Sequence, residues 1–160
     1  MEGRRGKAPS ADPEEAGTLT KLHGHCKCGA LTWRSDGPVL WSALCHCEDC
    51  RRAASSDYVS WFGVPRSSVR WSGPRVTYRS SEKVVRSFCG ACGAPASFES
   101  EVFPDETHLY AATLDDPGTY RPTAHIFWSE RLPWVRFDDG LPRYPKGSQD
   151  AAQTETPLPE

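Results

Sequence analysis

Seven cysteines stand in three short clusters, and their spacing is that of metal ligands. The clusters are Cys26-x-Cys28, Cys45-x-Cys47-x-x-Cys50 and Cys89-x-x-Cys92. Four thiolates close a structural zinc site, whereas three leave the zinc ion with an open coordination position. The seven cysteines are therefore predicted to form one metal site that holds the fold and a second that can do chemistry.

The two outer clusters are predicted to share one zinc ion. In residues 89–93, two intervening residues let both sulfurs turn toward one ion, and the glycines permit positive φ values. If residues 26–28 are extended, Cys26 and Cys28 point to one face and His25 points away. The site would close a loop of about 60 residues and stabilise the fold. Spacing alone leaves the pairing of clusters open, and a disulfide between Cys89 and Cys92 is an alternative.

The central cluster (Cys45, Cys47 and Cys50, here the cysteine trio) is predicted to place three sulfurs around a second zinc ion. Alternation puts Cys45 and Cys47 on one side of the chain and His46 on the other, and Cys50 returns if a short helix begins at Glu48. Water, a histidine or a substrate atom could take the fourth position. A second structural zinc completed by a histidine is therefore an alternative to a catalytic one.

Three thiolates make a zinc centre net negative, so it is a weaker Lewis acid than a zinc held by three histidines. Such a centre still binds soft thiolates, and an incoming thiol would lose its proton and act as a nucleophile. This favours thiol activation over metal-assisted hydrolysis, which is a third possibility. Arg51 and Arg52 follow Cys50 directly. They are candidate contacts for a substrate carboxylate, or they compensate the thiolate charge.

The elements that position these cysteines are predicted to be short β-strands of one all-β domain, with a short helix at residues 48–54. A Ser72-Gly73-Pro74 turn predicts a hairpin between residues 69–71 and 76–78. His125 is predicted to be a satisfied structural histidine, and Asp138-Asp139 a turn. The predicted strands lie at residues 31–33, 58–64, 69–71, 76–78, 84–88, 96–98, 108–111 and 125–128.

Composition predicts one domain at residues 18–145. Residues 1–17 lack large apolar side chains and residues 146–160 have only Leu158, so both are predicted to be disordered tails. A net charge of −2 without a basic run argues against nucleic-acid binding. No apolar stretch approaches the roughly 20 residues of a membrane span, and no secretory signal is evident. We therefore expect a cytoplasmic protein, where clustered cysteines are more often metal ligands than disulfides.

In this order, the three clusters resemble the glutathione-dependent formaldehyde-activating enzyme family, which includes the centromere protein V domain. The resemblance covers about residues 21–145. It implies a β-tent of short twisted antiparallel sheets around zinc sites, with at most short helices. It also implies a structural zinc on Cys26, Cys28, Cys89 and Cys92 and a catalytic zinc on Cys45, Cys47 and Cys50. The matching stretches are residues 24–30, 45–52, 88–93, 114–116, 125–127, 133–134 and 139–142.

The activity that the resemblance implies is the condensation of glutathione with formaldehyde to S-hydroxymethylglutathione, a carbon–sulfur lyase reaction in reverse. We therefore expect a zinc-dependent enzyme that joins or cleaves a small thiol and a small aldehyde. The alternative is a non-catalytic zinc module that binds protein or chromatin. Ala54 stands where the family commonly has a glycine. A positive φ there would strain an alanine and alter the pocket.

Overall fold

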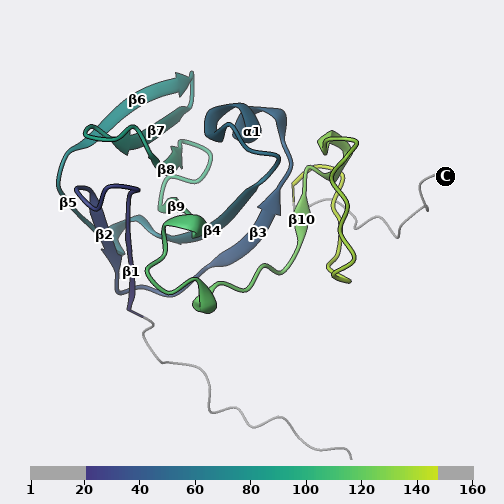
Figure 1. Ribbon diagram of the computed structural model, residues 1–160, viewed down its shortest axis with the longest axis horizontal. Helices are drawn as coiled ribbons and strands as arrows, with labels where there is room; N and C mark the ends of the chain where they lie inside the picture. The colour runs from purple at the N-terminus through teal and green to yellow at the C-terminus, as the bar shows by residue number, and fades with distance from the viewer. Residues whose placement is uncertain (1–20, 148–160) are drawn as a thin grey trace, which may run out of the picture.

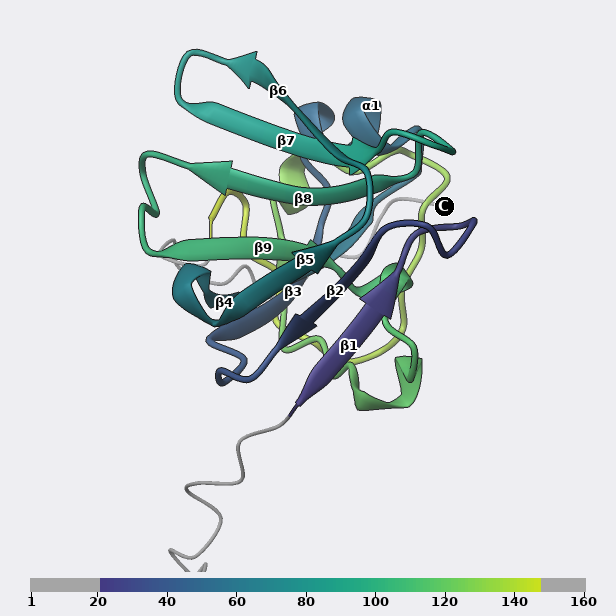
Figure 2. The same cartoon turned by 90° about the vertical axis from the view of Figure 1, so that its left-hand side faces the viewer.

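Two β-sheets of unequal size pack against each other and enclose the core (Figure 1, Figure 2). The computed structural model describes residues 21–147. The predicted tail at residues 1–17 lies outside this range, as does nearly all of the predicted tail at residues 146–160. The smaller sheet has three antiparallel strands in the order β1 (Leu22–His25), β2 (Thr32–Ser35) and β5 (Val69–Ser72).

The larger sheet has seven strands, and every neighbouring pair is antiparallel except β10 and β3. The helix α1 (Glu48–Ala54) joins β3 to β4, at the residues predicted for it. The predicted mainly β fold with short helices is thus confirmed. The strand order is β10 (His125–Ile126), β3 (Trp41–Cys45), β4 (Val59–Pro65), β9 (Glu106–Tyr110), β8 (Pro95–Ser100), β7 (Val84–Cys89) and β6 (Arg75–Ser81). Short 3₁₀ turns are η1 (Arg66–Ser68), η2 (Ala111–Thr113), η3 (Pro117–Thr119) and η4 (Trp128–Glu130).

The predicted hairpin between residues 69–71 and 76–78 is wrong, because the chain changes sheets at Gly73. Strand β5 pairs with β2, whereas β6 pairs with β7. Gly73 has a φ of +100°, and a Cβ atom there would lie 1.9 Å from the carbonyl oxygen of Ala30. Only glycine fits such a close approach of two backbones. The Ser-Gly-Pro signal therefore marks a crossover between the sheets and not a hairpin turn.

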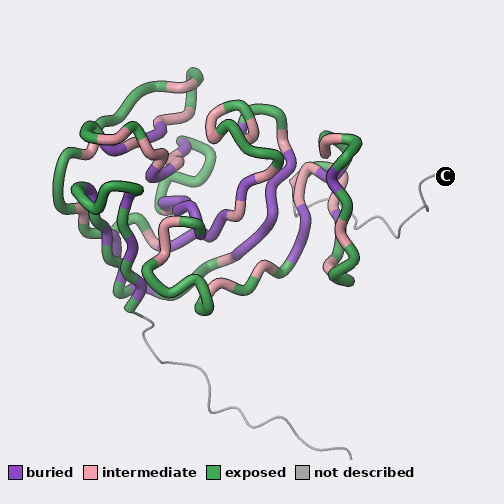
Figure 3. Tube along the Cα trace, viewed as in Figure 1, coloured by how far each residue is buried: buried purple, intermediate pink, exposed green. Residues whose placement is uncertain are grey.

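The core lies between the two sheets. Exposed and buried residues alternate along β1 and β2, so Leu22 and Trp33 point inward. They pack against Phe62 and Leu109 of the larger sheet, and each such buried side chain stabilises the fold by about 1.5–3 kcal/mol. Figure 3 shows that burial follows β3, β4 and β10 closely. The cysteine trio therefore begins at the end of a buried strand.

Helices long and apolar enough to cross a membrane do not occur within residues 21–147. The single α-helix of this range, α1, has seven residues. The connections between strands are mostly turns. The architecture thus places the cysteine clusters at the ends of strands and in the turns that follow them, so the sheets set their positions.

Candidate metal centres

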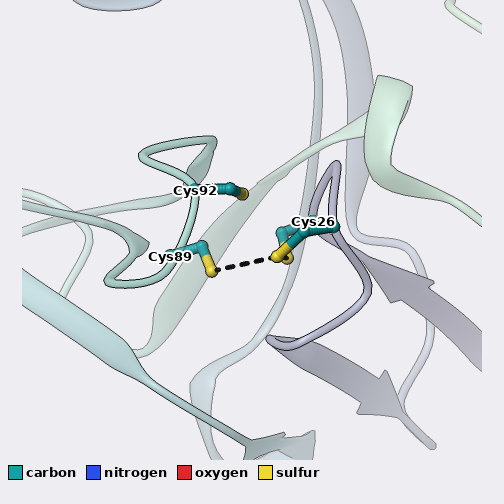
Figure 4. A group of neighbouring side chains, drawn as sticks. Cys26, Cys89 and Cys92 are labelled. Atoms are coloured by element: carbon teal, nitrogen blue, oxygen red, sulfur yellow. Dashed lines mark hydrogen bonds between the residues drawn. The ribbon is translucent and has the colours of Figure 1, made fainter.

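Cys26, Cys28, Cys89 and Cys92 come together at one point, where the two sheets meet. Their four Sγ atoms all lie within 4.8 Å of one another. The Sγ atom of Cys28 is 3.5 Å from that of Cys26 and 3.9 Å from that of Cys89. Figure 4 shows the sulfurs of Cys26, Cys89 and Cys92 pointing toward one another. The geometry thus favours the predicted pairing of the outer clusters.

The two chelating loops have similar backbones. The amide of Cys26 donates to the carbonyl of Leu31 at 2.9 Å, and the amide of Cys89 donates to that of Ala94 at 2.9 Å. Each loop turns at a glycine in the left-handed region, Gly29 at φ 77° and Gly93 at φ 75°. Residues 26–28 form a turn and are not extended, so the expected strand alternation does not apply there. The sulfurs converge because the turn curls both side chains inward.

All seven cysteines are free thiols in the structure, so the alternative of a Cys89–Cys92 disulfide is wrong. Zinc bound tetrahedrally at about 2.3 Å requires sulfur–sulfur distances of about 3.8 Å. The two distances found at the four-cysteine site bracket that value. Four thiolates at this spacing therefore fit a closed zinc site, as their chemistry predicts.

The cysteine trio forms a second group whose three Sγ atoms also lie within 4.8 Å of one another. Cys45 ends β3, Cys47 caps α1, and Cys50 lies in the first turn of α1. Cys45 and Cys50 are buried, whereas Cys47 is half-buried. Three thiolates fit a zinc ion that keeps one open position, and the side of Cys47 faces outward.

The start of α1 brings the third sulfur back to the other two. Cys47 is extended, with φ −61° and ψ 145°, and its Sγ atom accepts a hydrogen bond from the amide of Cys50 at 3.3 Å. Glu48 and Asp49 follow in the first turn, where negative charge stabilises a helix. The predicted helix start at Glu48 is therefore what closes the trio.

Arg86 of β7 is a neighbour of the trio that sequence reasoning missed. Its Nη2 atom donates to Asp49 Oδ2 at 2.6 Å and lies 3.8 Å from the Sγ atom of Cys50. Its side chain is only 2% exposed, and the guanidinium lies over the ring of Phe98 at 4.9 Å. The signal that could have found it is a charged residue in the apolar strand Val84–Cys89. A buried guanidinium here offsets the charge of the thiolates.

Protonation in the trio is uneven. Hydrogen bonds from Cys45 and Cys47 lower the pKa of Cys50 well below its ordinary value, and Arg86 lowers it further against the effect of burial. Hydrogen bonds to Cys47 and Cys50 raise the pKa of Cys45. Burial would lower the pKa of Arg86, but the charge of Cys50 and contacts with Cys50 and Asp49 raise it. The fold thus favours a thiolate at Cys50, and metal binding would displace the protons of the other two cysteines.

The two predicted substrate contacts, Arg51 and Arg52, differ in their surroundings. Arg51 is half-buried and donates to the carbonyls of His46 at 3.0 Å and Glu130 at 3.2 Å. The Arg52 side chain is 77% exposed and pairs with Glu48 at 2.7 Å. Arg51 thus fastens the loop of the trio, whereas Arg52 is held by an exposed ion pair that water screens.

The residue with a positive φ after the trio is Ser55 and not Ala54. Ala54 is the last residue of α1, and Ser55 caps the helix with φ 49°. The alanine that departs from the family pattern therefore sits in an ordinary helical conformation. The strain considered for Ala54 does not arise.

His46 points away from the trio, as predicted. Its ring contacts Trp128 at 4.9 Å and Phe137 at 5.8 Å between centroids. Burial lowers the pKa of His46 to about 4, so its ring is neutral at pH 7. His125 bonds both His46 and Asp139, which confirms the prediction of a satisfied histidine.

The chain is similar to known proteins in sequence and in fold. Over 82 residues the chain is 30% identical to an uncharacterized lyase of Schizosaccharomyces pombe, a match that covers 50% of this chain and 58% of that protein. The fold matches the crystal structure of a Rhodobacter sphaeroides protein with a TM-score of 0.50 and 21% identity, over 62% of this chain and 91% of the other. The sequence model of the glutathione-dependent formaldehyde-activating enzyme matches residues 21–130. That match covers more than half of the chain, so this chain belongs to the glutathione-dependent formaldehyde-activating enzyme family.

Proposed function

We propose that this protein is a zinc-dependent carbon–sulfur lyase that joins or cleaves a small thiol and a small aldehyde. The observation that supports this proposal most strongly is the cysteine trio, whose three sulfurs lie within 4.8 Å of one another beside the buried guanidinium of Arg86. Family membership and the lyase name of the yeast relative support the reaction class. Glutathione and formaldehyde are the proposed substrates, because the family is described by them.

The proposed reaction balances without a redox partner. The thiol sulfur forms a bond to the aldehyde carbon, the carbonyl π electrons move to oxygen, and the thiol proton ends on that oxygen. The reverse reaction breaks the same carbon–sulfur bond and returns the proton to sulfur. Zinc held by Cys45, Cys47 and Cys50 would lower the pKa of the incoming thiol. The four-cysteine site would hold a structural zinc.

The residues around the trio have distinct proposed roles. Arg86 lies opposite the thiolates and stabilises negative charge in a buried setting. Apolar side chains that pack on the trio, among them Phe98 and Phe127, exclude water from its inner side. The half-buried Cys47 marks the side from which a thiol would approach.

Arg52 is the better candidate of the two arginines for a substrate carboxylate. Its present partner Glu48 is 59% exposed, so a carboxylate of the thiol could replace it at little cost. Arg51 is committed to the carbonyls of His46 and Glu130. We propose that Arg51 acts by fastening the loop and that Arg52 binds substrate.

The test is Cys47→Ser. Serine is a better helix cap than cysteine, so α1 keeps its start while the trio loses one thiolate. The variant should stay folded, retain the zinc of the four-cysteine site and lose at least about 100-fold in rate. The rate would be measured by NMR from the exchange of labelled formaldehyde with glutathione. A folded variant with the wild-type rate would refute the proposed role of the trio.

A further inference from the structure

A buried chain of hydrogen bonds leads from the surface to the loop of the cysteine trio. Asp139 Oδ2 lies 3.0 Å from His125 Nε2, and His125 Nδ1 lies 2.9 Å from His46 Nε2. Both histidines are 0% exposed, whereas the side chain of Asp139 is 31% exposed. His46 stands between two cysteines of the trio. The chain therefore connects an outer carboxylate to the backbone that presents two donor sulfurs.

The order of partners defines the tautomers. A carboxylate can only accept, so Asp139 accepts the Nε2 proton of His125. The Nδ1 atom of a neutral His125 is then an acceptor, and His46 donates its Nε2 proton. The remaining Nδ1 atom of His46 has no hydrogen-bond partner within residues 21–147. At this Nδ1 position an unpaired acceptor nitrogen costs less free energy than a buried N–H group without a partner. The Asp139 carboxylate therefore selects the less costly pair of histidine tautomers.

His46 is also held at its main chain. Its amide donates to the carbonyl of Ile126 at 3.0 Å, and its carbonyl accepts from Arg51 Nε at 3.0 Å. The parallel pairing of β10 with β3 places Ile126 beside Cys45. The ring, the amide and the carbonyl of His46 are thus each held by a different partner. Because His46 lies between Cys45 and Cys47, fixing it restrains the backbone that carries their sulfurs.

We propose that Asp139 is a positioning residue for the cysteine trio, acting through His125 and His46 to hold Cys45 and Cys47 ready for metal. This inference rests on the proposed function, since it concerns how the same site is assembled. Asp139 lies beyond residue 130, where the family match ends. The segment after η4 is therefore part of the metal site, although it supplies no ligand.

Asp139→Asn tests the tautomer chain with almost no change of shape. One oxygen of Asp139 already accepts from the amide of Leu141 at 3.1 Å. Asparagine can keep that bond with its single oxygen and must then turn its NH₂ group toward His125. Both tautomers reverse, and His46 is left with a buried N–H group that has no partner. The matched control is Asp138→Asn, which removes the same charge from the exposed neighbour of Asp139.

Zinc affinity of the trio, measured by chelator competition, should fall about tenfold in Asp139→Asn and stay unchanged in Asp138→Asn. Zinc at the four-cysteine site is the internal reference and should not change. Nitrogen chemical shifts should report a protonated Nε2 in His46 of the wild type and a protonated Nδ1 in the variant. Equal zinc affinity in all three proteins, or a protonated Nδ1 in the wild type, would overturn the inference.

These outcomes separate the inference from the proposed function. If the wild-type trio binds no zinc and the protein has no activity, the proposed function is refuted. If the wild type holds two zinc ions and Asp139→Asn matches it in affinity, only the positioning role fails. The wild-type nitrogen shifts test the tautomer chain even if the variant does not fold.

Discussion

Replacing Arg86 by methionine should weaken zinc binding at the cysteine trio, although all three sulfurs stay in place. The substitution removes the guanidinium but keeps an apolar side chain over Phe98. The Asp49 side chain is 69% exposed, so water can replace its contact with Arg86. The main effect of the substitution is therefore the loss of the attraction between Arg86 and the Cys50 thiolate. Two unit charges 3.8 Å apart attract by about 4 kcal/mol at an effective dielectric constant of about 20.

The net effect should be smaller, because the wild type already bears the cost of burying Arg86. We expect a loss of about 1–3 kcal/mol, which corresponds to roughly 5–150-fold weaker zinc binding at the trio. Competition with a chromophoric chelator measures this affinity, and glutathione–formaldehyde exchange measures the rate. The control is Arg75→Met, which breaks a partly buried pair with Glu99 away from the trio. If Arg86→Met keeps zinc and rate within twofold of the wild type, the charge argument is wrong.

Three further predictions concern stability. Chelation that removes both metals should abolish cooperative thermal unfolding, because the four-cysteine site joins the sheets; an unchanged transition with no bound zinc would contradict this. Burial lowers the pKa of His108 against the opposing effect of Glu106, so the unfolded chain binds more protons below about pH 6.5. The free energy of unfolding should therefore fall as the pH drops below that value. His108→Gln should reduce the slope of this free energy against pH, measured by urea titration, by up to about 1.4 kcal/mol per pH unit. Equal slopes in the wild type and the variant would rule this out. Ser55→Gly should raise the free energy of unfolding by about 1 kcal/mol, because Ser55 has φ 49°, whereas Ser56→Gly should give no gain in the same urea assay.

The parts of the site that are local in sequence were predictable. Cysteine spacing located the three clusters but left the pairing of the two outer ones open, and the residues after Cys47 indicated the helix that returns Cys50 to the trio. The β character followed from apolar alternation. These features depend on contacts a few residues apart, where side-chain periodicity fixes direction.

Long-range features were not predictable in the same way. Arg86 reaches Cys50 across 36 residues, and although a charge within an apolar strand marks Arg86, it does not indicate the partner. Gly73 looked like a hairpin turn because the signal does not say whether the flanking strands pair. His125 and Asp139 were assigned separately as a structural histidine and a turn, and their shared role depends on the fold bringing them to His46.

The two halves of the four-cysteine site leave the ribosome at different times during synthesis. Cys28 and Cys89 are 61 residues apart, so at about 5–20 residues per second the ribosome needs roughly 3–12 s between them. During that interval the first pair of thiols has emerged without its partners and is open to oxidation or capture by a foreign metal. A zinc ion at this site, as proposed, would gain its full set of four ligands only after the second pair has emerged. Assembly of the zinc site proposed here would therefore depend on metal supply once the second pair has emerged, separately from how stable the finished fold is.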